Sequence, residues 1–440
     1  MRSARSSRRI APSWRSLATA ENWTYADAEA YLASLEPIGW RLGLERIRRL
    51  TSVMGMPQHR FASVHVVGTN GKSSVAQMTA ALLDAHGMSA GAYLSPHVER
   101  WTERVQVRGD EIAPDDLAAA IERTAESIVT VNRALDEGDA VTQFEAVTAA
   151  AFTALAAAEV DVGVIEAGLG GRLDATNVIP SQVCTLTSVG LDHTEWLGDT
   201  KAEIAAEKLA VLRDHSTLVI GTLDDDVELL AERVASDRGA ALVRAQPGPQ
   251  LHLRVPGEYQ RRNFAVALAA ARQVLGGLDV GAAERVASEL ELPGRLEVRA
   301  GDPPMILDAA HNPDGAQALA EALPGVADGR PVVACLALLE GKDAGSTIGA
   351  LSGAIDHAVC TEIAARRLAE LGRSGAVSIP AARLAELCAD AGVDAEAAVD
   401  PETAIERARS LARDRSGITL CTGSHYLLGY SWTEKHAPSS

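Results

Sequence analysis

The turn between Val66 and Ser73 holds the residues of this 440-residue sequence that are best suited to chemistry. It reads Val-Val-Gly-Thr-Asn-Gly-Lys-Ser and follows an apolar stretch that predicts a buried strand. Backbone N–H groups around Gly68 and Gly71 can point at one anion, while Lys72 and the start of the following helix add positive charge. The pattern predicts a cradle for the phosphates of a nucleotide triphosphate.

The loop is a shortened variant of the usual phosphate-binding loop, because Val66 stands where a glycine is expected five residues before Gly71. A Gly-Thr-Asn-Gly turn can also be a plain connector between a strand and a helix. The turn alone does not decide between these two interpretations, so the surrounding elements must.

Four polar motifs lie at the ends of predicted strands. The apolar runs and the residues to which they lead are 62–67 with the loop, 89–94 with Ser95, 160–166 with Glu166, and 182–189 with His193. Helical patterns alternate with these runs, which predicts an α/β fold with a mostly parallel sheet covered on both faces. Ligands of such sheets collect at the carboxyl ends of the strands. The four motifs are therefore expected to form one site.

The length of the chain suits two domains with separate cores. Strand and helix alternation restarts after Pro293-Gly294-Arg295, which we interpret as a hinge. We expect a basic arm at 1–20, an ATP-binding domain at 21–296 and a smaller α/β domain at 297–440. The arm carries five arginines and no acid, which is typical of a transit segment or of a disordered extension from an early start codon.

Charge and cysteine content exclude several classes of partner. The net charge of −18 makes the average surface repel nucleic acid and acidic lipid, and no apolar run is long enough for a membrane span. The five cysteines are scattered without a Cys-x-x-Cys pair. We therefore expect a reducing compartment, the cytoplasm, and no structural zinc.

Lysine is rare in this chain. Only five of the 41 basic residues are lysines, at positions 72, 201, 208, 342 and 435. Arginine cannot act as a compact, mobile ammonium group, and it does not readily lose its proton to become a nucleophile. We interpret Lys72 and Lys208 as chemical requirements for this reason.

The most specific string is Glu-Ala-Gly-Leu-Gly-Gly-Arg-Leu-Asp-Ala-Thr-Asn at 166–177. The other informative strings are the shortened loop, Ser95-Pro96-His97, Gly190-Leu191-Asp192-His193, Glu207-Lys208 and Asp308-Ala309-Ala310-His311-Asn312-Pro313. With these motifs the chain resembles the dihydrofolate synthase and folylpolyglutamate synthase family of Mur-type, ATP-dependent amide ligases. The match runs from about residue 25 to Gly429 and includes Gly341-Lys342-Asp343 and Thr422-Gly423-Ser424-His425. It implies a P-loop Mur-ligase-type central domain with a mostly parallel sheet, and a smaller Rossmann-like C-terminal α/β domain.

The resemblance implies a ligase that joins L-glutamate to a carboxylate of dihydropteroate or of a reduced folate. A carboxylate is a poor acyl donor, so the implied route is activation by ATP to an acyl phosphate, which the amine of glutamate then attacks. The implied cofactor is Mg²⁺, as one or two ions that Mn²⁺ could replace, and ATP is a co-substrate. The expected partners are these small molecules, with no nucleic acid and no membrane, and the family implies a monomer.

The resemblance also implies a role for each matching residue. The implied ATP-binding residues are Gly68, Thr69, Asn70, Gly71, Lys72, Ser73, Asn263, Arg295, Asp308 and His311. The implied metal ligands are Ser95, Glu166 and His193, and the implied catalytic residues are Lys72, His193 and Lys208, the last of which is often carbamylated in the family. The positions that match the pterin contacts of relatives are Thr142, Gln143, Phe144, Glu145, Leu173, Asp174 and Ala175. One residue departs from the family pattern, since Ser73 replaces a usual glycine. In addition, histidine is an atypical ligand for Mg²⁺.

Each of these assignments has an ordinary alternative. His193 could be a buried structural histidine, and Lys208 could form a helix salt bridge to the neighbours of Glu207 or to Glu203. Asp308 could cap the next helix, and Phe144 could be plain core. The function of the whole chain also has two alternatives. The chain could be a nucleotide-binding relative that has lost its catalytic activity, or another Mur-type amide ligase. A muramyl-peptide synthetase is disfavoured because fewer than 70 residues precede Gly68. Glutamate-dependent phosphate release separates a ligase from a binding protein.

Overall fold

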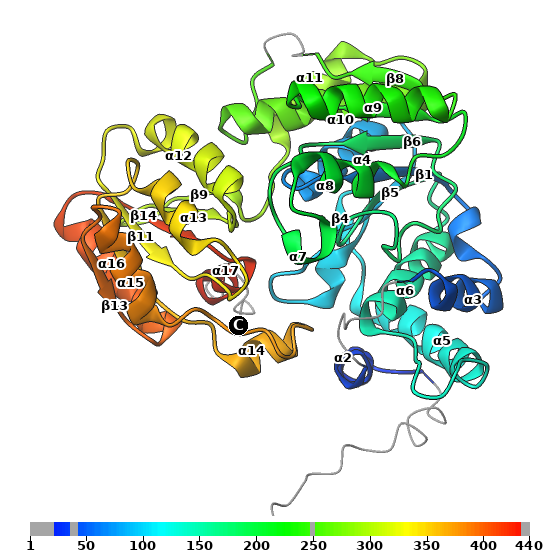
Figure 1. Ribbon diagram of the computed structural model, residues 1–440, viewed down its shortest axis with the longest axis horizontal. Coiled ribbons are helices and arrows are strands. Elements are labelled where there is room, and N and C mark those ends of the chain that lie inside the picture. Colours follow the sequence, from blue (N-terminus) through cyan, green and yellow to red (C-terminus); the bar gives the residue numbers. More distant parts are fainter. Residues whose placement is uncertain (1–21, 36–42, 247–250, 433–440) are drawn as a thin grey trace, which may run out of the picture.

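The computed structural model describes residues 22–35, 43–246 and 251–432 and contains two sheets, each covered by helices (Figure 1). The expected basic arm at 1–20 lies outside the described residues. In Figure 1 the unit coloured blue to green and the unit coloured yellow to red lie side by side. In the described part of the chain, all elements of the first unit precede those of the second, and the chain passes from one unit to the other near residue 294.

The first unit is built on an eight-stranded sheet with the order β4-β3-β2-β5-β1-β6-β7-β8. The six strands from β2 to β8 in this order run parallel, and β3 and β4 form an antiparallel edge. The strands are β1 (Ala62–Val67), β2 (Ala90–Tyr93), β3 (Val105–Val107), β4 (Asp110–Glu111), β5 (Val162–Glu166), β6 (Val183–Leu186), β7 (Thr217–Ile220) and β8 (Ala241–Arg244). Strands such as β5 are buried along their whole length, which explains why they read as continuous apolar runs.

Helices cover both faces of the first sheet. They are α2 (Tyr25–Ser34), α3 (Glu45–Val53), α4 (Lys72–Ala85), α5 (Pro114–Asn132), α6 (Gln143–Ala157), α7 (Thr194–Leu197), α8 (Lys201–Leu209), α9 (Asp225–Asp237), α10 (Glu258–Leu275) and α11 (Val280–Glu289), with the short 3₁₀ turns η1 (Pro57–His59) and η2 (Trp101–Arg104). Val64 and Val164 belong to the core beneath α4 and α10, whereas Ile165 belongs to the core beneath α5 and α6. This alternation follows from the two-residue period of side chains along a strand.

The second unit is a six-stranded sheet with the order β13-β12-β11-β14-β10-β9. Only β9 runs antiparallel to its neighbour. The strands are β9 (Arg295–Arg299), β10 (Met305–Asp308), β11 (Val332–Leu336), β12 (His357–Cys360), β13 (Ala395–Ala397) and β14 (Ile418–Thr422). The helices are α12 (Pro313–Ala327), α13 (Ala344–Leu351), α14 (Ala365–Glu370), α15 (Ala381–Asp390), α16 (Pro401–Asp414) and α17 (His425–Trp432).

The predicted fold class is confirmed, since both sheets are mostly parallel and covered by helices. The segment interpreted as a hinge leads directly into strand β9, which begins at Arg295, two residues before the expected start of the second domain. None of the helices in the described part of the chain has both the length and the apolarity to cross a bilayer. All five cysteines are free and buried.

Candidate active site

A cavity of about 590 Å³ lies at the carboxyl ends of β1, β5 and β6 and is closed on its far side by the second unit. It brings together every predicted ATP-binding residue, the predicted metal ligands and Lys208. These residues come from positions 68 to 311 of the chain, so separate strand ends line one cavity, and their role as one site stays a prediction.

The phosphate loop is held in a left-handed turn that needs glycine. Gly71 has φ +83° and precedes helix α4, and a Cβ atom there would lie 2.5 Å from Oδ1 of Asn263. The loop backbone is fixed from β6, because Thr187 Oγ1 donates to the carbonyl of Asn70 at 2.6 Å and Ser188 Oγ accepts from the Asn70 N–H at 3.0 Å. The turn is therefore a rigid, preformed concavity rather than a loose connector.

Two lysines converge on one carbonyl of this loop. Lys72 Nζ donates to Gly68 O at 3.1 Å, and Lys208 Nζ donates to the same oxygen at 2.9 Å. Burial lowers the pKa of both amines, and for Lys208 burial together with the nearby Lys72 charge lowers it to about 7. A substantial part of the Lys208 amine is therefore neutral near pH 7 and can act as a nucleophile.

The structure does not support the alternative of a helix salt bridge for Lys208. Glu203 caps helix α8 by accepting from the Thr200 N–H at 3.1 Å, and Glu207 pairs with Arg172 at 2.9 Å. The only hydrogen bond that the described residues give the Lys208 ammonium is the one to Gly68 O.

Glu166 is a buried carboxylate at the end of β5, directly beside the loop. It accepts from Ser73 Oγ at 3.1 Å and from the Ser95 N–H at 3.1 Å, and its side chain is almost inaccessible. Burial raises the pKa of Glu166, while the Lys72 ammonium opposes that effect. Arg295 Nη2 donates to Ser73 Oγ at 3.3 Å, so the serine that replaces a glycine bridges the two units. The Glu166 and Ser95 oxygens are the kind of ligand that Mg²⁺ or Mn²⁺ prefers, so these two residues fit the metal implied by the family.

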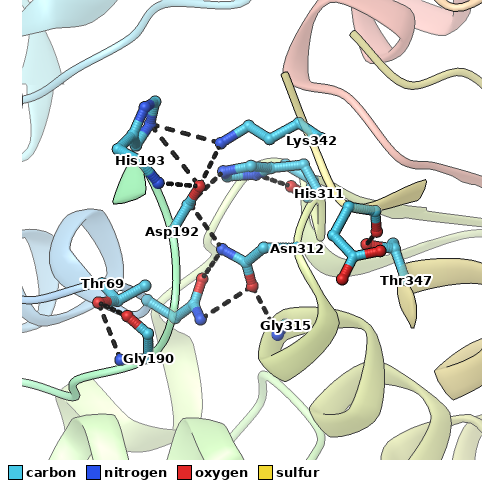
Figure 2. Close-up of polar contacts among 12 residues, drawn as sticks. Thr69, Gly190, Asp192, His193, His311, Asn312, Gly315, Lys342 and Thr347 are labelled. Atoms are coloured by element: carbon cyan, nitrogen blue, oxygen red, sulfur yellow. Dashed lines mark hydrogen bonds and ion pairs between the residues drawn. The ribbon is translucent and has the colours of Figure 1, made fainter. Parts of the chain in front are cut away.

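His193 lies in the same cavity but has different neighbours. Figure 2 shows its imidazole directed at Lys342, with Nε2 3.4 Å from Lys342 Nζ. Its side chain is 33% exposed, which excludes the alternative of a buried structural histidine. Burial, and next the Lys342 charge, lower its pKa to about 3, so the ring is neutral and could act as a ligand.

Among the residues that the structure describes, no three His, Cys, Asp or Glu side chains cluster as a preformed metal site. The geometry brings Ser95 and Glu166 together and leaves His193 on the Asp192 side of the cavity. The three-residue metal site stays a prediction.

The second unit contributes a strand end to the cavity. Asp308 ends β10 and accepts from Tyr259 OH at 3.0 Å, from the Leu296 N–H at 2.8 Å and from the Ala310 N–H at 2.8 Å. It does not cap the following helix, because Asn312 is the N-cap of α12. Burial raises the pKa of Asp308, and the Arg295 charge opposes this.

The predicted pterin positions line a second, smaller cavity of about 260 Å³. Its walls include all of them except Gln143, namely Thr142, Phe144, Glu145, Leu173, Asp174 and Ala175. Gln143 is buried, lines the larger cavity and donates to Leu32 O at 2.7 Å. Phe144 satisfies both interpretations, since it packs against the core beneath α6 and also lines both cavities.

The acidic residues of the smaller cavity are held by neighbours. Glu145 accepts from Arg46 Nε at 3.0 Å, and Thr142 with Glu145 forms a capping box at the start of α6. Asp174 accepts from the Leu169 N–H at 2.8 Å and from Thr176 Oγ1 at 2.5 Å, and burial raises its pKa. Two fixed carboxylates in a cavity with apolar walls can accept hydrogen bonds from a flat, amino-substituted ring.

Sequence reasoning gave no role to Lys342 and Arg373, which line both cavities, or to Asn312. Lys342 donates to Asp192 Oδ1 at 2.6 Å, and Asn312 donates to Asp192 Oδ2 at 3.0 Å. Arg373 lines both cavities, and within the described residues its buried Nε has no hydrogen-bond partner. The scarcity of lysine was a usable signal for Lys342, whereas Arg373 is one of many arginines and carries no local pattern.

Comparison with known proteins agrees with this architecture. The model of the Mur ligase middle domain matches residues 66–246, and that of the Mur ligase glutamate ligase domain matches residues 294–425. The fold and the site thus define an ATP-dependent ligase of the Mur type.

The dihydrofolate synthase/folylpolyglutamate synthase of Mycobacterium tuberculosis is 35% identical over 358 residues, which are 72% of this chain and 74% of that protein. A structure from Escherichia coli in complex with DHPP and ADP has a TM-score of 0.82 and 27% identity, and covers 96% of this chain and 99% of that one. A bifunctional folylpolyglutamate synthase/dihydrofolate synthase with Mn, AMPPNP and L-glutamate bound has a TM-score of 0.80 and 31% identity, and covers 95% of this chain and 99% of that one. The chain belongs to the dihydrofolate synthase/folylpolyglutamate synthase family.

Proposed function

We propose that this ligase uses ATP to form an amide between L-glutamate and the carboxylate of dihydropteroate or of a reduced folate. The observation that carries the proposal is that the two cavities share lining residues. Residues assigned to ATP line the larger one, residues assigned to the pterin line the smaller one, and Phe144, His193, Lys342 and Arg373 line both. A substrate whose pterin ring occupies the smaller cavity can extend its carboxylate toward the phosphate loop.

The first step that we assign is attack of the substrate carboxylate oxygen on the γ-phosphorus of ATP, with ADP as leaving group. Lys72 at the loop and Arg295 opposite it are placed to neutralise negative charge on the transferred phosphoryl group. The α-amino nitrogen of glutamate then attacks the acyl carbon, and inorganic phosphate leaves. The second unit shields the acyl phosphate from water, since Asp308, His311 and Arg295 close the far side of the cavity.

We assign a divalent cation to the Ser95 and Glu166 oxygens, with His193 as a further ligand. Such an ion, when bound, would neutralise charge on the phosphate oxygens. The relative that binds Mn together with AMPPNP supports this assignment. Glu166 itself is kept close to the loop by its hydrogen bonds from Ser73 and Ser95.

We further propose that Lys208 becomes carbamylated by CO₂. Carbamylation joins the neutral amine nitrogen to the carbon of CO₂ with release of one proton, and the lowered pKa of about 7 supplies the neutral amine. The product is an anion beside the Lys72 ammonium, so the modification would turn a repulsion between two cations into an attraction.

The proposal also includes the domain limits, the oligomeric state and the cellular location. We assign 21–296 to the ATP-binding domain and 297–440 to the domain that closes over it, with the chain acting as a monomer in the cytoplasm. The five free, buried cysteines support a reducing environment.

A substrate panel tests the proposed function. Purified enzyme is given ATP, labelled glutamate and one of dihydropteroate, tetrahydrofolate or its diglutamate, and both the labelled product and the phosphate are measured. We expect label to enter at least one pteridine product with one phosphate released per amide. Hydrolysis of ATP that neither glutamate nor any pteroate accelerates would instead indicate a nucleotide-binding relative without ligase chemistry.

A further inference from the structure

Asn312 connects the second unit to the phosphate loop through its side-chain amide. Its Nδ2 donates to Asn70 Oδ1 at 3.1 Å, and its Oδ1 accepts from Asn70 Nδ2 at 3.1 Å, so the two amides form a reciprocal pair. The same Oδ1 accepts from the Gly315 N–H at 2.9 Å, and the same Nδ2 donates to Asp192 Oδ2 at 3.0 Å. Three of the four hydrogen bonds of this buried side chain therefore cross from one unit to the other.

Asp192 forms the second half of this contact. It follows β6 in the first unit and accepts from Lys342 Nζ at 2.6 Å, and its Oδ2 lies 3.6 Å from Nε2 of His311. The carboxylate thus accepts hydrogen bonds from two side chains of the second unit, Lys342 and Asn312, and lies beside a third, His311.

Asn70 lies at the centre of the loop, between Gly68 and Lys72. Hydrogen bonds with the Thr187 and Ser188 side chains hold the Asn70 backbone in place within the loop. A shift of the loop would therefore change the position of the Asn70 side-chain amide. We propose that the Asn70–Asn312 pair and Asp192 form a latch that couples the phosphate-bearing loop to docking of the second unit. Asn312 is then a positioning residue. The proposal rests on the proposed function only in taking the loop to bind ATP.

A merely structural role for Asn312 is the competing explanation, because it also caps helix α12. Asn312→Asp separates the two roles. Aspartate caps a helix as well as asparagine does, so the bond from the Gly315 N–H is kept. The same change removes the only donor group of the side chain and places a second carboxylate beside Asp192. Two of the three bonds between the units are therefore lost, and only the one that Asn70 Nδ2 donates can be kept.

Three measurements on the full chain test the latch. The first is the dissociation constant for ADP by calorimetry, the second is glutamate-dependent turnover, and the third is the change in radius of gyration on adding AMPPNP by solution scattering. Asp400→Asn is the matched control, because Asp400 caps helix α16 by accepting from the Thr403 N–H and its side chain has no contact with the latch residues. We expect N312D to keep the wild-type melting temperature within a few degrees and to bind ADP within about threefold of wild type. Its turnover should fall by at least about tenfold, because a like-charge contact replaces a buried hydrogen bond.

A compensating change makes the test sharper. In Asp192→Asn combined with Asn312→Asp, the donor and the acceptor exchange places, so part of the lost turnover should return. On adding AMPPNP we expect the wild type to compact and N312D to compact less. The proposal is overturned if N312D compacts and turns over like the wild type, or if D400N is equally impaired. Absence of turnover in the wild type itself would refute the proposed function instead, and the scattering change would still show whether the latch responds to nucleotide.

Discussion

Replacing Lys208 by methionine should make the protein more stable and at the same time inactive. The Lys208 side chain is 4% exposed, and burial followed by the Lys72 charge lowers its pKa from 10.5 to about 7. A difference of about 3.5 pH units corresponds to on the order of 5 kcal/mol against the charged form in the folded state. Methionine has nearly the same length and no charge, and Gly68 O keeps its bond from Lys72 at 3.1 Å, so no acceptor is left without a partner.

The pH dependence of this effect follows from proton binding. The unfolded chain keeps the Lys208 proton up to about pH 10.5, whereas the folded chain loses it near 7. The destabilisation is therefore complete below pH 7 and disappears as the pH rises toward 10.5. We expect K208M to exceed the wild type by on the order of 2–4 kcal/mol in free energy of unfolding at pH 6, and by about half of that at pH 9.

Urea unfolding in CO₂-free buffer at pH 6 and pH 9 measures this difference. Lys201→Met is the matched control, because Lys201 begins the same helix, is 37% exposed and pairs with Asp224 at the surface. Its effect should stay within about 0.5 kcal/mol. Adding bicarbonate at pH 8 should stabilise the wild type but not K208M, and intact-protein mass should show one added CO₂. A K208M protein that is less stable than the wild type at pH 6, or a gain that does not change with pH, would refute the reasoning.

Three further substitutions probe the cavities. Lys72→Ala should lower kcat by about 10²–10³-fold with unchanged circular dichroism, because a charge aimed at the transferred phosphoryl group is lost; near-native turnover would contradict the cradle. Gly71→Ala should lower the free energy of unfolding by about 1–3 kcal/mol and weaken ADP binding in calorimetry, because φ at this residue is +83° and the new Cβ would meet Asn263. Binding of ADP as tight as in the wild type would show that the turn can adapt. Arg373→Ala should raise the KM of an anionic substrate about tenfold or more in steady-state assays, because its guanidinium faces both cavities, and an unchanged KM for both glutamate and folate would exclude that role.

The elements that place the site were predictable because they obey simple periodic rules. Strands β1, β2, β5 and β6 fall within the expected runs 62–67, 89–94, 160–166 and 182–189, since a buried parallel strand is a short apolar run. Motifs at strand ends then had to meet, because parallel strands bring their carboxyl ends to one edge. Strand β9 was missed, since its antiparallel sequence Arg-Leu-Glu-Val-Arg is short and charged.

Contacts between the two units were not predictable from the sequence. Asn70 and Asn312 lie 242 positions apart, and no local pattern joins them. Asp308 was open to an ordinary interpretation as a helix cap because the sequence does not show that Asn312 takes that position. Such pairs depend on how the second unit docks, which neither propensity nor spacing encodes.

The central claim is that the two cavities serve one reaction through an acyl phosphate. The most direct measurement uses dihydropteroate or folate labelled with ¹⁸O in its reacting carboxylate, with ATP and glutamate, and follows the label by mass spectrometry. The account predicts that one ¹⁸O atom appears in the inorganic phosphate for each amide formed, because the carboxylate oxygen attacks the γ-phosphorus and leaves with it. Amide formation with phosphate that contains no ¹⁸O would contradict it.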